Sequence, residues 1–165
     1  MLVAAAHAKL NLSLAITGRR ADGFHELVSL VAAVALADTL TLEVGRPLGL
    51  TCDDASLPVD GTNLVLKAAT AYLKRRPSAT VGHFHLIKKV PHGAGLGGGS
   101  SDAAAALRLL DQASGDPLGL EELEALAAAV GSDCPFFVRG QAAIMRGRGG
   151  RLEILSATAR AALAG

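Results

Sequence analysis

One segment limits what this chain can fold into more than any other, the run PHGAGLGGGSSD at residues 91–102. Five of the seven residues from 93 to 99 are glycine, an apolar run precedes them, and a run rich in alanine and leucine follows. Glycine lets main-chain N–H groups approach a ligand closely, and a helix N-terminus adds unpaired donors and the positive end of a dipole. The segment therefore predicts an anion-binding loop between a strand at 81–90 and a helix from about Ser100 to Ala113, capped by the Ser-Ser-Asp group.

Three other interpretations of this segment fit its surroundings poorly. Gly93, Gly95 and Gly98 satisfy the dinucleotide pattern GxGxxG, but the sequence after the predicted helix leads into another helix and not into a parallel strand that ends in an acidic residue. The Walker pattern requires a lysine before its serine or threonine, and here Ser100 follows glycine. A flexible linker would not join an apolar strand to a strongly helical run. A distinct phosphate-binding loop remains.

Length and composition indicate one globular domain with a sizeable core. The chain has 165 residues, 50% of them hydrophobic, and a formal net charge of +1. This charge balance argues against nucleic acid or a membrane as a partner, and one Tyr, four Phe and no Trp leave few rings to stack on bases. Cys52 and Cys134 form no metal-binding pattern, so we expect no metal ligands in the protein and a reducing, cytoplasmic location. Polar residues interrupt the apolar N-terminus, which argues against a signal peptide.

The hydrophobic patterns predict an α+β fold. Alternation indicates a half-buried strand at 9–16, with Leu10, Leu12, Leu14 and Ile16 on its apolar face. The other predicted strands lie at 27–36, 39–44 and 81–90, with a closing hairpin of 142–147 and 151–155, and the other predicted helices lie at 63–76, with Thr62 or Asn63 as N-cap, and at 120–130. We expect a mostly antiparallel sheet with the helices on one face.

The glycine segment resembles the second motif of the GHMP kinases, which has the form P-x-x-x-G-L-G-x-S-S and is followed by a helix. Three more segments match the family in the same order, AKLNLSLAITGRRADGFHEL at 8–27, DGTNLVLKAA at 60–69 and GSDCPFFVRGQA at 131–142. The resemblance implies a ribosomal protein S5 domain 2-like fold, with residues 1–165 as the N-terminal, ATP-binding domain and the family's C-terminal domain absent from this chain. It also implies a monomer or weak homodimer.

By the same resemblance, the loop would hold ATP, with Mg²⁺ carried on the nucleotide. Main-chain amides would surround the phosphates, and the two serines could also touch a metal-bound oxygen. The expected ATP-binding residues are Pro91, His92, Gly93, Ala94, Gly95, Leu96, Gly97, Gly98, Gly99, Ser100 and Ser101.

Two residues are expected to carry the chemistry. Lys9 lies in the family's A-K-x-N motif, which implies a place beside the acceptor hydroxyl and the transferred phosphate, where its charge would stabilise the transition state. Asp133 lies in GSDCPFF, where the family has G-A-D-V-P, and the match implies that it accepts the proton of the substrate alcohol. Asn11 shares a strand face with Lys9 and is expected to orient substrate hydroxyls.

The resemblance is strongest to those GHMP kinases that phosphorylate the 2-hydroxyl of 4-diphosphocytidyl-2-C-methyl-D-erythritol in non-mevalonate isoprenoid precursor synthesis. Phe24 and His25 stand at the family's Tyr-His pair, whose ring stacks on cytosine and whose histidine hydrogen-bonds the base edge. Two alternatives stay open, a non-catalytic nucleotide-binding fragment and a sibling GHMP kinase that acts on another small alcohol. The Phe24-His25 pair argues against the sibling, because those kinases have no cytosine to stack.

Overall fold

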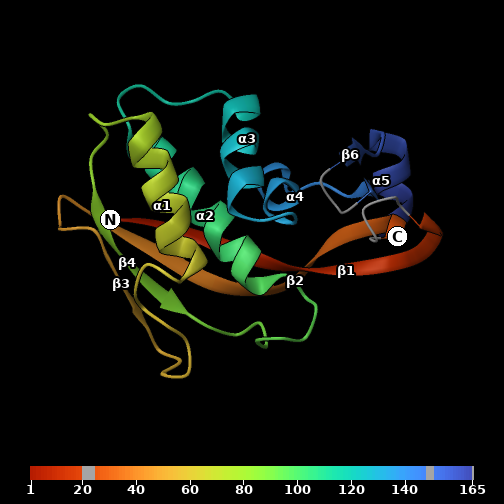
Figure 1. Cartoon of the computed structure of the whole chain (residues 1–165), viewed down its shortest axis with the longest axis horizontal. Helices are drawn as coiled ribbons and strands as arrows, with labels where there is room; N and C mark the ends of the chain where they lie inside the picture. The colour runs from red at the N-terminus through yellow and green to blue at the C-terminus, as the bar shows by residue number, and fades with distance from the viewer. Residues whose placement is uncertain (20–24, 148–150, 165) are drawn as a thin grey trace.

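The computed structural model of the chain describes residues 1–19, 25–147 and 151–164. Its strands are β1 (Leu2–Arg19), β2 (His25–Val44), β3 (Gly49–Cys52), β4 (Gly82–Ile87), β5 (Ala143–Gly147) and β6 (Arg151–Ile154). Its helices are α1 (Leu64–Arg75), α2 (Gly98–Ala113), α3 (Leu120–Val130), α4 (Cys134–Arg139) and α5 (Ala157–Ala164). The arrangement confirms the α+β class (Figure 1).

β2 is the longest strand and pairs with three others. β1 runs antiparallel along one edge of it, β4 and then β5 pair along the other edge, and β6 extends the sheet beyond β5. Among the described strands only β3 and β4 are parallel, so the prediction of a mostly antiparallel sheet is confirmed. The sequence predicts two strands at 27–36 and 39–44, whereas the structure has one, and Asp38 lies inside it.

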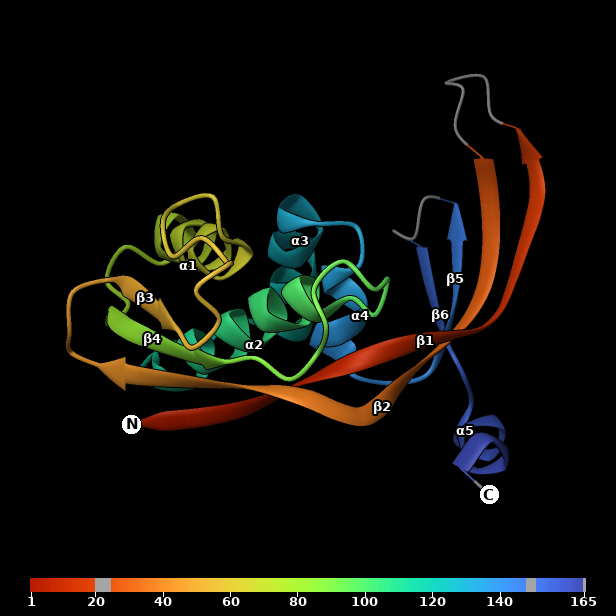
Figure 2. The ribbon, with the colours of Figure 1, turned by 90° about the horizontal axis from the view of Figure 1, so that it is seen from below.

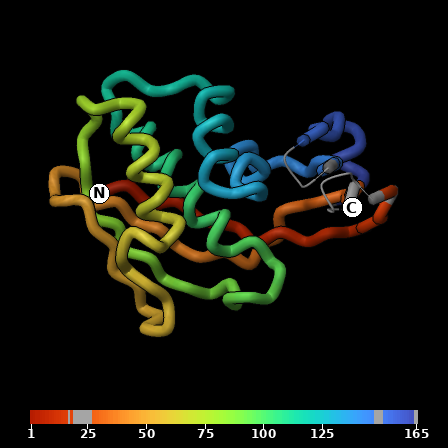
Figure 3. The backbone as a smooth tube through the Cα atoms, in the orientation of Figure 1, coloured from red at the N-terminus to blue at the C-terminus, as the bar shows by residue number. Residues whose placement is uncertain are grey.

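Helices α1 to α4 cover one face of the sheet, and α5 lies on the opposite side (Figure 2). α2 is the central helix, since it contacts β1, β2 and the helices α1, α3 and α4. Its alanines at 103–106 are fully buried, and such small side chains allow α2 to pack closely against the sheet. The expectation of helices on one face therefore holds for α1 to α4 and is wrong for α5. β1 starts at one end of the molecule and α5 lies at the other (Figure 3).

The outer part of β1 differs from its predicted burial. The alternation predicts that Leu10, Leu12, Leu14 and Ile16 face a core, but these side chains are 44–64% exposed. β1 and β2 curve away from the helical layer at this end (Figure 2), and the register between them shifts at three points. The apolar face therefore has no helix of the α1–α4 layer above it. The periodicity identified the strand correctly and could not show what would pack on it.

The N-termini of α1 and α2 show whether the predicted caps are correct. Of the two predicted candidates, Thr62 and Asn63, it is Asn63 that caps α1, since its side-chain oxygen accepts the N–H of Val65 at 2.9 Å. The Ser-Ser-Asp cap of α2 is wrong, since Gly97 occupies the N-cap with φ 71° and both serines lie inside the first turn. The sequence did not predict β3, α4 or α5, which are too short to show a clear period. No helix in the described ranges is both long and apolar enough to cross a bilayer.

Candidate functional site

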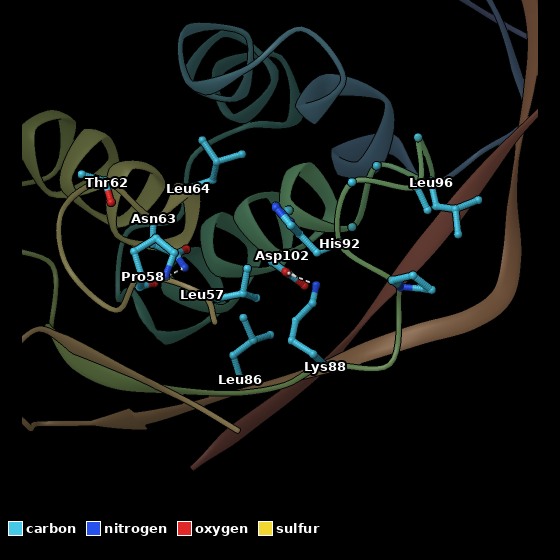
Figure 4. Close-up of a pocket in the computed structure, with 17 residues that line it drawn as sticks. Leu57, Pro58, Thr62, Asn63, Leu64, Leu86, Lys88, His92, Leu96 and Asp102 are labelled. Carbon is cyan, nitrogen blue, oxygen red and sulfur yellow. Dashed lines mark hydrogen bonds and ion pairs between the residues drawn. The ribbon is translucent and has the colours of Figure 1, made fainter. Parts of the chain in front are cut away.

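The glycine segment forms a loop over a pocket at the N-terminal end of α2 (Figure 4). Gly93, Gly95 and Gly97 have φ values of 74°, 74° and 71°, which residues other than glycine rarely adopt. The pocket has a volume of about 220 Å³ and is lined by all of residues 91–99, by the start of α1, and by Leu86, Lys88 and Asp102 among others. One wall is thus glycine backbone, which a negatively charged ligand can approach closely.

Position 97 requires glycine for packing as well as for its φ value. A Cβ atom there would lie 2.7 Å from Cζ of Phe137 and 3.3 Å from Cε of Lys9. The backbone N–H of Lys9 also donates to the carbonyl of Leu96 at 2.9 Å. The loop is therefore packed against β1 and α4, which lie far from it in the sequence.

Three of the predicted site residues form one cluster beside this loop. Nζ of Lys9 lies 3.4 Å from Oδ2 of Asp133, and the two side chains are 8% and 30% exposed. Lys9 also donates to the side-chain oxygen of Asn11 at 3.3 Å, and that oxygen lies 3.1 Å from the hydroxyl of Ser29 on β2. Asp133 stands at the start of α4 and has the more exposed side chain of the pair. A cation and an accessible carboxylate thus lie at the edge of the glycine loop.

The other predicted residues are placed less uniformly. Residues 91–99 all line the pocket, but neither serine does. Ser101 is buried in α2, where its N–H donates to the carbonyl of Gly97 at 2.9 Å, and Oγ of Ser100 lies near Gly131 in the turn before Asp133. Phe24 and the side chain of His25 lie outside the described residues.

The sequence did not reveal a second charged cluster below the loop, formed by Asp38, Lys88 and Asp102. Nζ of Lys88 donates to Oδ2 of Asp38 at 2.5 Å and to Oδ2 of Asp102 at 2.9 Å (Figure 4 shows the second contact). The side chains of Lys88, Asp38 and Asp102 are 9%, 0% and 4% exposed. One signal could have revealed it: an aspartate among apolar strand residues needs a buried partner. Asp38 falls between the strands predicted at 27–36 and 39–44, so the sequence did not mark it as a buried strand residue.

The buried position of this cluster changes the pKa values of Asp102 and Lys88. Removal from water raises the pKa of Asp102 to about 7, although the charge and hydrogen bond of Lys88 act in the opposite direction. Burial alone would lower the pKa of Lys88, but its hydrogen bonds and attraction to the two carboxylates outweigh burial and raise that pKa. Oδ1 of Asp102 is buried and has no hydrogen-bond partner among the described residues. Lys88 therefore stays charged, whereas burial favours the protonated form of Asp102.

Comparisons with known proteins agree on one family. Residues 63–141 match the family described as GHMP kinases N terminal domain. A 4-diphosphocytidyl-2-C-methyl-D-erythritol kinase from Azorhizobium caulinodans is 49% identical over 155 residues, which span 92% of this chain and 54% of that protein. The protein of the same name from Xanthobacter autotrophicus is also 49% identical, over 160 residues that span 95% of this chain and 54% of that protein.

A solved structure gives the same result. The crystal structure of 4-(cytidine 5'-diphospho)-2C-methyl-D-erythritol kinase superposes with a TM-score of 0.82 and 41% identity, and the match covers 94% of this chain and 55% of that one. The chain thus spans about half the length of the relatives that it matches.

Proposed function

This chain belongs to the GHMP kinase family and has the ribosomal protein S5 domain 2-like fold, and on that premise we propose that it binds ATP and phosphorylates the 2-hydroxyl of 4-diphosphocytidyl-2-C-methyl-D-erythritol. The observation that carries the proposal is the Lys9–Asp133 pair, 3.4 Å apart, at the edge of the glycine loop. Residues 1–165 would serve as the ATP-binding domain. Phosphoryl transfer to an alcohol needs a phosphate cradle, a cation and a group that receives the proton.

The glycine loop supplies the cradle. The three glycines with positive φ turn the backbone so that its N–H groups can converge on phosphate oxygens, and the N-terminus of α2 follows directly. ATP supplies the phosphoryl group when it is bound. The loop contains no lysine, so the cation at the transferred group has to come from another element. Lys9 on β1 meets this need, because its stem packs against Gly97.

Asp133 accepts the proton in this proposal. The O–H bond of the substrate breaks, its oxygen forms a bond to the terminal phosphorus of ATP, and the bond to the ADP oxygen breaks with its electron pair left on ADP. Lys9 stabilises the negative charge on the transferred group. Asn11 accepts a hydrogen bond from the ammonium of Lys9 and so helps to fix the direction in which this cation points.

Magnesium fits this site as part of the nucleotide. Among residues 1–19, 25–147 and 151–164, no group of three or more His, Cys, Asp or Glu could hold a metal ion. Mg²⁺ ordinarily keeps several waters and takes its other ligands from substrate phosphates and one or two carboxylates. Phosphate oxygens in the loop would therefore be its main ligands, as the resemblance implies.

Recognition of the cytidine group is assigned to Phe24 and His25 through the resemblance alone. His25 opens β2 and pairs with Arg19, so this position belongs to the same β1–β2 pair that carries Lys9 and Asn11. The assignment is tested by adding either a cytidine nucleotide or a simple alcohol such as homoserine as a competitor of substrate phosphorylation. Competition by homoserine and none by cytidine diphosphate would favour a sibling kinase.

The reaction is tested on the chain itself. We would incubate it with ATP, Mg²⁺ and 4-diphosphocytidyl-2-C-methyl-D-erythritol and detect the phosphorylated product by mass spectrometry. Asp133→Asn should slow product formation by about 10²–10⁴-fold, because the group that receives the proton is gone. Asp116→Asn is the matched control, since this carboxylate is 80% exposed and only pairs with Arg76 at the surface.

Two outcomes would change the proposal. Product formation by Asp133→Asn at the wild-type rate would remove Asp133 from its role. Calorimetric binding of ATP with no product from the wild-type chain would favour the non-catalytic nucleotide-binding fragment.

A further inference from the structure

The glycine loop has two ends, and one buried cluster holds both of them. The chain leaves β4 after Ile87, passes through residues 88–90 into the loop, and enters α2 at Gly98. Asp38, Lys88 and Asp102, called the loop clamp from here on, come from β2, from the entry to the loop and from the first turns of α2. The chemistry proposed above uses none of the three.

Asp38 fixes the entry to the loop. Its Oδ1 accepts the backbone N–H of Lys89 at 2.5 Å and of Val90 at 2.8 Å, while its Oδ2 accepts from Nζ of Lys88. The residue is fully buried inside β2, so the anchor is part of the sheet. Three donors on one carboxylate leave the backbone at 88–90 little freedom.

Lys88 joins the entry to the exit. Its ammonium bridges Asp38 on the sheet and Asp102 on α2. A Cβ atom at Gly98 would lie 3.3 Å from Nζ of Lys88 and 3.0 Å from Cγ1 of Val90. The ammonium therefore lies directly below the point where the loop becomes a helix, and the absence of a side chain at 98 makes room for it.

Asp102 lines the pocket and has one carboxylate oxygen without a hydrogen-bond partner among the described residues. Its Oδ2 accepts from Lys88, while Oδ1 is buried without a partner, and the residue lines the pocket (Figure 4). With two carboxylates and one ammonium, the loop clamp carries a net negative charge when Asp102 is ionised. A bound phosphate chain adds negative charge above it. A proton on Asp102 would relieve that repulsion and occupy the free oxygen.

We propose that Asp38, Lys88 and Asp102 are positioning residues for the nucleotide: they hold the two ends of the glycine loop at the spacing that its phosphates need, and Asp102 takes up a proton when the nucleotide binds. The proposal deepens the proposed function and rests on it. Burial raises the pKa of Asp102 to about 7, so the group can gain or lose this proton at physiological pH.

Few charged groups face Asp102. Asp38 approaches from β2 and Lys88 from the end of β4. His92, on the loop, lines the same pocket. The first residue of α1, Leu64, and the two residues before it, Thr62 and Asn63, line the pocket and carry no charge.

The clamp itself is tested without nucleotide. Hydrogen–deuterium exchange at the amides of residues 93–99 should speed up by about tenfold or more in Lys88→Met, because the link between the loop ends is lost. Lys89→Met is the matched control, one residue along and exposed. Asp102→Ala cuts only the link to α2 and serves if Lys88→Met fails to fold. Asp102→Asn retains an acceptor for Lys88 and should restore slow exchange. Unchanged exchange in a folded Lys88→Met or Asp102→Ala would overturn the clamp.

The proton is tested by the pH profile of MgATP affinity, measured by calorimetry on the same variants. Wild-type affinity should fall by about fivefold from pH 6 to pH 8 relative to Asp102→Asn, in which position 102 cannot ionise. The titration of ATP is common to both proteins and cancels in the ratio. Equal slopes would overturn proton uptake at Asp102. If the wild-type chain binds no MgATP, the proposed function and proton uptake fail together, whereas the exchange experiment still decides whether the clamp orders the loop.

Discussion

Two clusters of lysine and aspartate flank the glycine loop, and their surroundings separate their roles. In the first, Lys9 and Asp133 lie 3.4 Å apart and Asp133 is 30% exposed, so its carboxylate can reach a proton on a bound substrate. In the loop clamp, Lys88 and its two carboxylates are at most 9% exposed and bond to backbone and to each other. We therefore propose that the same residue types serve chemistry where one side is open to solvent and support the loop where all sides are closed.

The two clusters should differ most in how much they contribute to the free energy of unfolding. Asp38→Ala should lower the free energy of unfolding by about 3–5 kcal/mol, because it leaves the buried Lys88 and two backbone N–H groups with fewer partners. Asp133→Ala should lower it by less than about 1 kcal/mol, since that carboxylate is partly exposed. Urea denaturation of both variants measures the difference. Equal losses would mean that burial does not distinguish the two clusters.

Gly97 lies between the two clusters and should be nearly as sensitive. Gly97→Ala places a Cβ 2.7 Å from the ring of Phe137 at a positive φ, and we expect a loss of about 2–4 kcal/mol. Gly99→Ala is the control. Gly99 lies within α2, and a Cβ there would be at an ordinary contact distance of 3.6 Å from Leu64 of α1. Thermal denaturation of the pair should show a loss for position 97 only. An equal loss at both positions would argue against a specific packing role for Gly97.

The pH dependence of stability should come from the loop clamp. The pKa of Asp102 is raised to about 7 by burial, so the folded state holds a proton that the unfolded state has released between about pH 4 and pH 7. Stability from this group is therefore complete below pH 4 and is lost as the pH rises through 7. From pH 5.5 to pH 7 the loss should be about 2 kcal/mol. Asp102→Asn should remove this slope in urea denaturation at several pH values, and a slope that persists would assign it to another group.

An ion pair at the solvent-exposed surface should have the smallest effect. Arg146 on β5 and Glu153 on β6 lie 3.4 Å apart, and their side chains are 47% and 64% exposed. Arg146→Gln should change the free energy of unfolding by less than about 0.5 kcal/mol, because water and salt screen such a pair. Urea denaturation at low and high salt measures this change. A loss close to that of Asp38→Ala would refute the ranking by burial.

Much of the fold followed from local patterns. The sequence predicted the helices at α1, α2 and α3, a cap at Thr62 or Asn63 and the closing hairpin, because each depends on spacing within a short segment. It also predicted the glycine loop, since few other arrangements tolerate so much glycine between a strand and a helix. The cap of α2 was wrong because the loop itself enters the helix at Gly97.

Burial was harder to predict than secondary structure. Leu12 and Leu14 alternate as core residues do, yet they are exposed where β1 curves away from the helices. Asp38 resembles a break between strands, yet it is fully buried inside β2. Both errors have one cause, since burial depends on segments that are distant in the sequence.

The amino-acid sequence by itself determined the glycine loop and the helices α1, α2 and α3, because these depend on local spacing, and its resemblance to the GHMP kinases supplied the candidate residues Lys9, Asn11 and Asp133. Only the tertiary structure decided that Lys9 and Asp133 meet at the loop and that Lys88 is enclosed by Asp38 and Asp102. The physical reason is that a charge acts according to its distance from other charges and from water. Those distances are set by the packing of β1, β2 and α2.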